Sequence, residues 1–236
     1  ENLEDLRRRV LPKDRRCFAF FHPSMPDEPL IFVEVALTHG VANSIQDVLS
    51  ETREEIDIQD ADSAIFYSIS NCQEGLLGIS FGNSLIKQVV QDLSRELPNL
   101  KTFVTLSPIP GLSKWIEKNE LQTISQDETK LKQLAANYLL EAKQSNGDPI
   151  DPVAKFHLGN GAVIHQINID ADLSAKGLFQ SYGVMVNYLY DPLKISHNGE
   201  LFSKEGQIAA SSAVKSLSRQ AERIILQAAE AKELAN

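Results

Sequence analysis

The chain has 236 residues, 42% of them hydrophobic and 23% charged, which is ordinary for a globular protein. The formal net charge of -9 argues against a general nucleic-acid surface, although a local basic patch for a phosphorylated ligand remains compatible with it. No run approaches the roughly 18 apolar residues of a membrane span, and residues 1–9 lack the apolar core of a signal peptide. We therefore expect a cytoplasmic protein with a single core, and neither nucleic acid nor a membrane as partner.

The first third of the chain predicts strands. Residues 1–14 form a lead-in with a charged helix from Leu3 to Val10, and β-branched and aromatic residues then predict strands over 15–23, 31–38 and 64–70. A loop and a short helix occupy residues 43–55. Arg15 and Arg16 are interpreted as either solvated or phosphate-facing. Cys17 and Cys72 lack the CxxC spacing of a zinc site, so we expect reduced thiols and no metal.

A glycine-punctuated segment follows the third strand. Gly75, Gly78 and Gly82 precede an apolar helical stripe that runs from Leu85 until Pro98 ends the helix. A strand, a glycine turn and a helix N-terminus make an anion cradle, because free backbone N–H groups and the positive end of the helix point at the turn. Such glycines also occur in turns that bind nothing, so the segment indicates either a phosphate site or an ordinary turn.

Ser107 is placed at the end of the next strand, over residues 102–106, where prolines and a glycine turn the chain. Pro108 biases Ser107 toward an extended backbone, so the hydroxyl is held at the carboxyl end of a buried strand. In open α/β sheets ligands bind at that edge. The alternative interpretation is a serine that only caps the strand end.

The second half of the chain begins with helix and linker over residues 115–149. His157 comes next, followed by Gly159, Asn160 and Gly161, whose glycines allow close backbone approach and left-handed turns. The imidazole is interpreted as either structural or functional. The remainder predicts a strand over 162–169, a polar turn around residues 174–177, a strand over 183–190 and a final helix from about residue 207.

Five motifs, in order along nearly the whole chain, together resemble the malonyl-CoA decarboxylase family. They are RRCFAFFHP at 15–23, GISFGN at 78–83, LSPIPG at 106–111, FHLGNGA at 156–162 and MVNYLY at 185–190. The resemblance implies one catalytic domain over residues 1–236 with a GNAT-like acyltransferase fold, a mixed central sheet flanked by helices. In that fold the pyrophosphate of CoA rests on the turn between a strand and the following helix.

The resemblance also implies which residues form the site. The family's catalytic serine, histidine and tyrosine map onto Ser107, His157 and Tyr190. The substrate-binding positions are Gly78, Ser80, Gly82, Asn83 and Asn160, and Ser80 departs from the glycine usual at its position.

The implied reaction is conversion of malonyl-CoA to acetyl-CoA and CO2, a step of fatty acid metabolism. Loss of CO2 leaves a thioester enolate, so donors must face the carbonyl oxygen, and each is worth roughly 3 to 4 kcal/mol elsewhere. His157, with a pKa near working pH if unperturbed, is the expected proton donor or relay, Ser107 orients the malonyl carboxylate and passes a proton on, and Tyr190 is a neutral donor. No cofactor is expected, because the thioester is the electron sink.

Two other functions stay open. One is an acyltransferase or thioesterase with Ser107 as nucleophile and His157 as base, although no GxSxG elbow supports it. The other is a CoA-binding module without catalysis. Family members also carry a helical amino-terminal domain used in oligomerisation, so a homo-oligomer is considered. This chain starts beyond that domain, as either a catalytic-domain fragment or a naturally short member, and does not end in the peroxisomal Ser-Lys-Leu.

Overall fold

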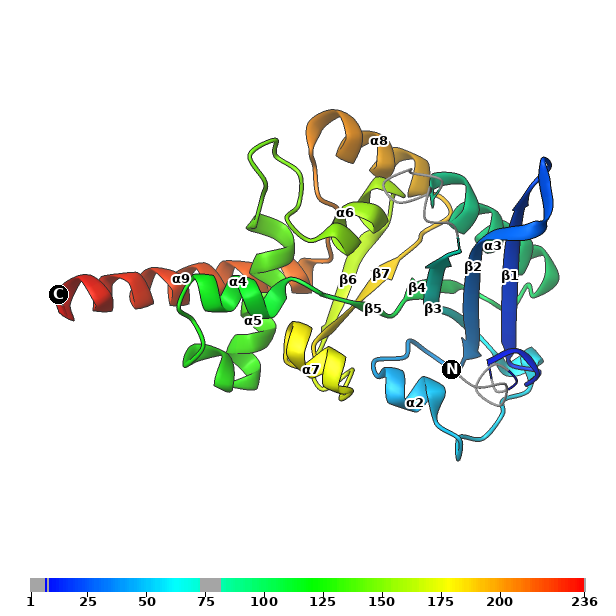
Figure 1. The fold of residues 1–236 in the computed structure, drawn as a ribbon, viewed down its shortest axis with the longest axis horizontal. Helices are drawn as coiled ribbons and strands as arrows, with labels where there is room; N and C mark the ends of the chain where they lie inside the picture. The colour runs from blue at the N-terminus through cyan, green and yellow to red at the C-terminus, as the bar shows by residue number, and fades with distance from the viewer. Residues whose placement is uncertain (1–6, 8, 73–81, 236) are drawn as a thin grey trace.

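The computed structural model describes residues 7, 9–72 and 82–235, and its centre is one mixed β-sheet (Figure 1). Seven strands make up this sheet in the described residues, in the order β1-β2-β3-β4-β7-β5, with β6 also paired to β7. The strands are β1 (Arg15–His22), β2 (Met25–Thr38), β3 (Ser63–Asn71), β4 (Thr102–Thr105), β5 (Ser107–Pro108), β6 (Val163–Asn168) and β7 (Met185–Leu189). The expected mixed sheet flanked by helices is confirmed.

The strand directions follow from the connections. β1, β2 and β3 are antiparallel, and a two-residue turn joins the first two. β3 and β4 are parallel, which requires a long crossover, and this crossover contains helix α3 (Gly82–Glu96). β7 runs antiparallel to β4, β5 and β6, so it ties the two halves of the sheet together.

The other helices surround this sheet, and the C-terminal part of α9 extends away from it (Figure 1). They are α2 (Ile45–Leu49), α4 (Leu112–Lys118), α5 (Glu128–Glu141), α6 (Pro152–Gly159), α7 (Ala175–Ser181), α8 (Ile195–Glu205) and α9 (Ser212–Ala235), with 3-10 turns at Ile58–Asp60 and Ile124–Gln126. Among the described residues no helix combines the length and the apolar character that crossing a membrane requires.

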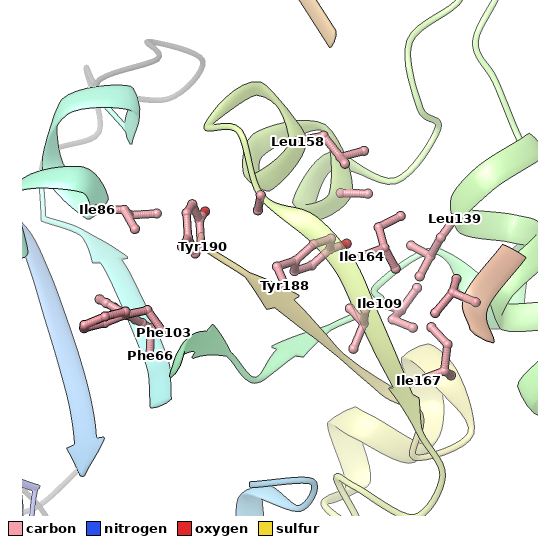
Figure 2. Packing of buried hydrophobic residues seen from close by; sticks show 14 of the residues in the cluster. Phe66, Ile86, Phe103, Ile109, Leu139, Leu158, Ile164, Ile167, Tyr188 and Tyr190 are labelled. Carbon is pink, nitrogen blue, oxygen red and sulfur yellow. The ribbon is translucent and has the colours of Figure 1, made fainter. Parts of the chain in front are cut away.

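Among the described residues, the buried hydrophobic side chains form two clusters. Neighbouring residues of one strand fall in different clusters: Phe66 and Phe103 belong to the larger one, Ile65 and Val104 to the smaller. Because successive strand side chains point to opposite faces, the two clusters lie on opposite faces of the sheet. Figure 2 shows the larger cluster around Tyr188 and Tyr190.

Several predicted elements are corrected. The polar turn around residues 174–177 is helix α7, where the Ser174 side chain caps the helix by accepting a hydrogen bond from Gly177 N. A helix of seven residues is too short for a clear apolar stripe. α8 was not predicted, and the final helix begins at Ser212 and not near residue 207. The charged helix from Leu3 to Val10 lies largely outside the described residues.

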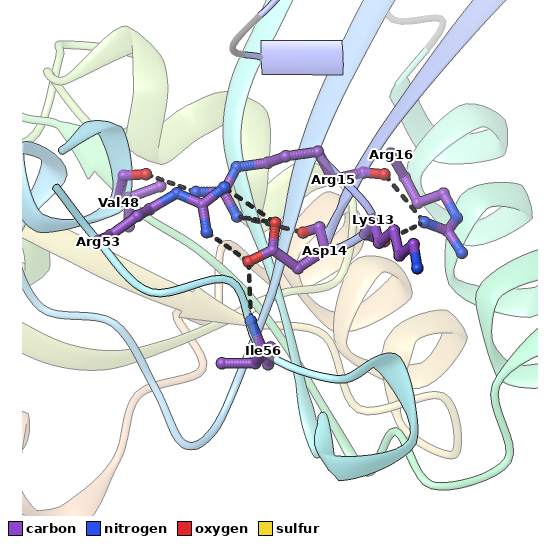
Figure 3. A network of polar contacts seen from close by, with 7 residues as sticks. All are labelled: Lys13, Asp14, Arg15, Arg16, Val48, Arg53 and Ile56. Carbon is purple, nitrogen blue, oxygen red and sulfur yellow. Dashed lines mark hydrogen bonds and ion pairs between the residues drawn. The ribbon is translucent and has the colours of Figure 1, made fainter. Parts of the chain in front are cut away.

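Arg15 is buried, which corrects its interpretation as a solvated side chain. Its guanidinium is buried, donates to Val48 O at 2.6 Å and lies 3.3 Å from an Asp14 carboxylate oxygen, which also pairs with Arg53 (Figure 3). Burial lowers the pKa of Arg15, and Asp14 partly opposes that effect. This buried network joins the start of β1 to the segment after α2. Arg16 instead pairs with Glu96 of α3 at 2.8 Å. Cys17 and Cys72 are both free and exposed.

Candidate active site

The parallel strands β3 and β4 diverge at Ser107. Phe66 of β3 pairs with Thr105 of β4, and Leu106 N still donates to Phe66 O at 3.0 Å. From there β3 continues to Asn71 alongside β2 alone, whereas Ser107 turns away and pairs with Val186 of β7. Ser107 therefore lies at the divergence of two strands, at the carboxyl end of β4, as its position before Pro108 predicted.

His157 lies on helix α6, an element that the sequence analysis did not predict. Asp151 caps α6 by accepting from Val153 N and Ala154 N, and Pro152 occupies the first turn. Asn160 ends the helix, and Gly161 adopts a left-handed φ of 79°. These are ordinary helix start and stop signals. They place His157 in the last turn, on the side of the helix that faces the sheet.

Ser107, His157 and Tyr190 form one hydrogen-bonded chain. Ser107 Oγ lies 3.1 Å from His157 Nε2, and the Tyr190 hydroxyl lies 2.8 Å from His157 Nδ1. Tyr190 directly follows β7, where its backbone N donates to Phe103 O at 2.8 Å. All three side chains are at most 5% exposed. The fold thus brings together three residues that span 83 positions of sequence, although their chemical roles do not follow from contact alone.

Burial sets the protonation states of these three hydrogen-bonded side chains. It lowers the pKa of His157 to about 3 and raises the pKa of Tyr190 well above its ordinary value. The C-terminal end of a helix favours a cationic histidine by up to about 2 kcal/mol, but here desolvation is the larger effect. Both ring nitrogens face neutral hydroxyls and no carboxylate. The imidazole is therefore neutral at physiological pH, and the near-neutral pKa expected for an unperturbed ring does not apply.

Two further residues support the histidine, and sequence reasoning missed both. Thr105 Oγ1 accepts hydrogen bonds from Ser107 Oγ at 2.8 Å and from Tyr188 N at 3.2 Å. The Tyr188 ring stacks on the imidazole at a centroid distance of 4.4 Å and an interplanar angle of 24°. Each lies two residues from a predicted site residue on the same strand face, Thr105 from Ser107 and Tyr188 from Tyr190. That spacing was the available signal.

A ladder of buried amides fixes the backbone beneath Thr105. Asn187 Nδ2 donates to Thr105 O at 2.8 Å and to Ala42 O at 3.0 Å, and its Oδ1 accepts from Asn168 at 2.7 Å. Asn187 is completely buried. Because a buried amide held on both sides has little freedom to move, the end of β4 and the Ser107 backbone are set by β7 as well as by β3.

The predicted phosphate loop falls mostly outside the described residues. Gly78 and Ser80 are not described, and Gly82 and Asn83 are placed only as the first residues of α3. Asn160 is buried, and its Nδ2 donates to Phe156 O at 2.9 Å. Its Oδ1 has no hydrogen-bond partner among the described residues.

A parallel strand pair that diverges beside β7, with α3 as its crossover, is the arrangement of a GNAT-like α/β protein. A solved GNAT-like decarboxylase, GphF in complex with isobutyryl-CoA, is similar at a TM-score of 0.56 and 19% identity over 81% of this chain and 86% of that one. At that identity the likeness concerns the fold alone.

The comparisons at higher identity define the family. The family model of the malonyl-CoA decarboxylase C-terminal domain matches residues 1–129 and 117–231. The mitochondrial malonyl-CoA decarboxylase of Rattus norvegicus is 38% identical over 92% of this chain and 53% of its own length. The crystal structure of malonyl-CoA decarboxylase from Rhodopseudomonas palustris is 48% identical with a TM-score of 0.86, over 92% of this chain and 56% of that one. This chain belongs to the malonyl-CoA decarboxylase family, and it spans about half the length of the curated relatives it matches.

Proposed function

We propose that this chain carries the catalytic site of a malonyl-CoA decarboxylase and converts malonyl-CoA to acetyl-CoA and CO2. The observation that carries the proposal is the buried chain from Tyr190 through His157 to Ser107, at the divergence of β3 and β4 in a protein of this family. The site offers neutral proton donors and a relay, which are the groups that quenching an enolate requires.

The proposed chemistry balances as follows. The bond between the malonyl carboxylate carbon and the α carbon breaks, CO2 leaves, and the electron pair enters the thioester to form an enolate. The α carbon then takes the Ser107 hydroxyl proton, the imidazole returns a proton to Ser107 Oγ, and the Tyr190 hydroxyl resupplies the imidazole. After the products leave, the relay runs back: Ser107 returns a proton to Nε2, Nδ1 returns one to Tyr190, and Ser107 takes one proton from solvent. All three groups regain their starting protonation, and the overall reaction consumes one proton.

The low pKa of His157 suits this relay. A cationic imidazole is not available at neutral pH when the pKa is about 3. A neutral ring that bonds a hydroxyl at each nitrogen can still receive a proton at one nitrogen while it releases one from the other. The strongly basic enolate supplies the driving force. Because the thioester carbonyl is the electron sink, the proposal includes no metal and no cofactor.

Two parts of the chain are assigned to CoA binding, the segment before α3 and Asn160. We propose that the segment including Gly78, Ser80, Gly82 and Asn83 holds the pyrophosphate. Its support is that β3 precedes it and the 15-residue helix α3 begins at Gly82, which gives it the positive end of a long helix. Asn160 Oδ1, which no described residue bonds, is a buried acceptor that an amide N–H of the pantetheine arm would satisfy.

A product assay tests the reaction. Purified protein incubated with malonyl-CoA should release CO2 and acetyl-CoA in equal amounts, without added metal. Release of free CoA and malonate would assign the chain to the thioesterases instead, and substrate binding without turnover would make it a binding module. Activity lost on chelation and restored by Zn²⁺ would contradict the metal-free proposal.

A double-mutant comparison tests the site. Ser107→Ala and His157→Gln should each lower kcat by about a hundredfold or more and leave KM within about threefold, because neither residue is assigned to the nucleotide. The double variant should be little worse than the worse single variant, since the two residues act in one relay. Losses that multiply, or a covalent malonyl adduct on Ser107 seen by mass spectrometry, would contradict the shared relay.

A further inference from the structure

Thr105 decides where the hydroxyl proton of Ser107 points. Ser107 Oγ is the donor and Thr105 Oγ1 the acceptor in their 2.8 Å hydrogen bond. Thr105 Oγ1 also accepts from the backbone N of Tyr188 at 3.2 Å, and Thr105 is completely buried. A hydroxyl that receives two hydrogen bonds in a fixed position acts as an anchor for both donors.

The direction of this hydrogen bond also determines which nitrogen of the His157 imidazole carries the proton. The only hydroxyl proton of Ser107 is directed at Thr105. Ser107 Oγ, which lies 3.1 Å from His157 Nε2, can therefore only accept a hydrogen bond from that nitrogen. A neutral imidazole carries one N–H, so Nε2 bears the proton and Nδ1 is left as the acceptor for the Tyr190 hydroxyl at 2.8 Å. The four side chains then form a hydrogen-bonded chain in one direction, from Tyr190 through His157 and Ser107 to Thr105.

We infer that Thr105 is a positioning residue that holds His157 in the Nε2–H tautomer, and thereby makes the Ser107–His157 pair a proton-delivery device and not a serine nucleophile. A nucleophilic serine needs the opposite arrangement, in which an unprotonated Nε2 accepts the hydroxyl proton. In this structure Nε2 offers a proton to Ser107 Oγ, which is what Ser107 needs once its own proton has turned from Thr105 Oγ1 to an enolate carbon. The direction of proton delivery rests on the proposed decarboxylation, whereas the assignment of the Nε2–H tautomer does not depend on that proposal.

The test reads the tautomer directly. Long-range ¹H–¹⁵N correlation spectra of the ¹⁵N-labelled protein near pH 7 distinguish a protonated from a bare ring nitrogen, and the signals of His157 are those missing in His157→Gln. The wild-type protein should show Nε2 protonated and Nδ1 bare. Thr105→Val keeps the shape but removes the acceptor, so Ser107 should turn its proton to Nε2 and the ring should become protonated at Nδ1. Thr105→Ser, which keeps the hydroxyl, should restore the wild-type pattern.

Two outcomes would overturn the inference: an Nδ1–H ring in the wild-type protein, or an Nε2–H ring that persists in Thr105→Val. Because the valine variant also leaves Tyr188 N without its partner, it can fail to fold, and Tyr190→Phe then serves in its place. If Thr105 holds the tautomer, Nε2 stays protonated without the Tyr190 hydroxyl, and loss of that state would assign the control to Tyr190 and reject Thr105.

Kinetics supply the second readout. Thr105→Val should lower kcat for malonyl-CoA by about tenfold or more with KM within about twofold, because a misplaced proton affects the chemical step and not binding. Thr105→Ser should stay within about threefold of wild type. Spectra that show a Thr105-dependent Nε2–H ring in a protein without decarboxylase activity would reject the proposed function and leave the inference standing. A kcat equally low in the serine variant would reject the role of the hydroxyl.

Discussion

The hydroxyl of Tyr190 lies 2.8 Å from Nδ1 of His157, in the place where a serine hydrolase has a carboxylate. A carboxylate there would stabilise an imidazolium ion, whereas a buried phenol with a raised pKa does not. In the described part of the chain, no carboxylate bonds the ring to offset the cost of burying its charge. The neutral state of His157 follows from desolvation by burial, with a hydroxyl and not a carboxylate at Nδ1.

The neutral ring makes the stability of the fold depend on pH. In the unfolded chain His157 takes up a proton near pH 6.5, but in the folded protein only near pH 3. Between these values the unfolded state binds more protons, so the free energy of unfolding should fall on acidification, by about 1.4 kcal/mol per pH unit for this group. Urea unfolding from pH 7.5 to pH 4.5 measures the slope.

The His157→Gln variant is the control for this slope. Burial raises the pKa of Asp151, whose contribution has the opposite sign just above pH 4, but Asp151 is present in both proteins and cancels in the difference. The variant should have the shallower dependence on pH below 6.5. Parallel curves would show that His157 is protonated in the folded state.

Tyr190→Phe should lower kcat for malonyl-CoA by about a hundredfold, because it removes the group that resupplies the relay while the ring still fills its site. The matched control is Tyr67→Phe, since the buried Tyr67 hydroxyl has no partner among the described residues. That control should keep wild-type kcat and stability. Similar kcat values for the two variants would contradict the assignment of Tyr190.

Asp14→Ala should destabilise the protein by about 3–5 kcal/mol, because it leaves the buried guanidinium of Arg15 without its counter-ion. Glu96→Ala breaks the more exposed pair with Arg16 and should cost about 1 kcal/mol or less. Chemical unfolding of the two variants gives the comparison. Equal losses would mean that burial does not determine the importance of the Asp14 network.

Gly161→Ala should be far more harmful than Gly40→Ala. Both glycines have a positive φ, 79° and 75°, so each alanine pays a strain of about 1–2 kcal/mol. A methyl group on Gly161 would also collide with the backbone carbonyl of Ile195, whereas one on Gly40 meets nothing within 4 Å. The expected result is a much larger fall in Tm for Gly161→Ala. Comparable falls would show that α8 can move away from α6.

Most strands were predictable because they are local patterns. β1, the second half of β2, β3, β4, β6 and β7 follow from β-branched and aromatic runs. The sequence did not predict that Ser107 and Pro108 leave β4 and pair with β7 as β5. The set of five motifs also identified the family, which the comparisons confirm. α6, α7 and α8 were missed because short or mixed helices lack a clear stripe.

The amino-acid sequence by itself determined the strands, the family, and the choice of Ser107, His157 and Tyr190. The tertiary structure alone decided how these side chains are arranged. It seats the imidazole between two hydroxyls, stacks it on Tyr188 and removes it from water, so that its pKa falls to about 3. It also places Thr105 where it turns the Ser107 proton away from the ring. The physical reason is that propensity acts between neighbours in the chain, whereas desolvation and hydrogen-bond direction arise from every element packed around a group.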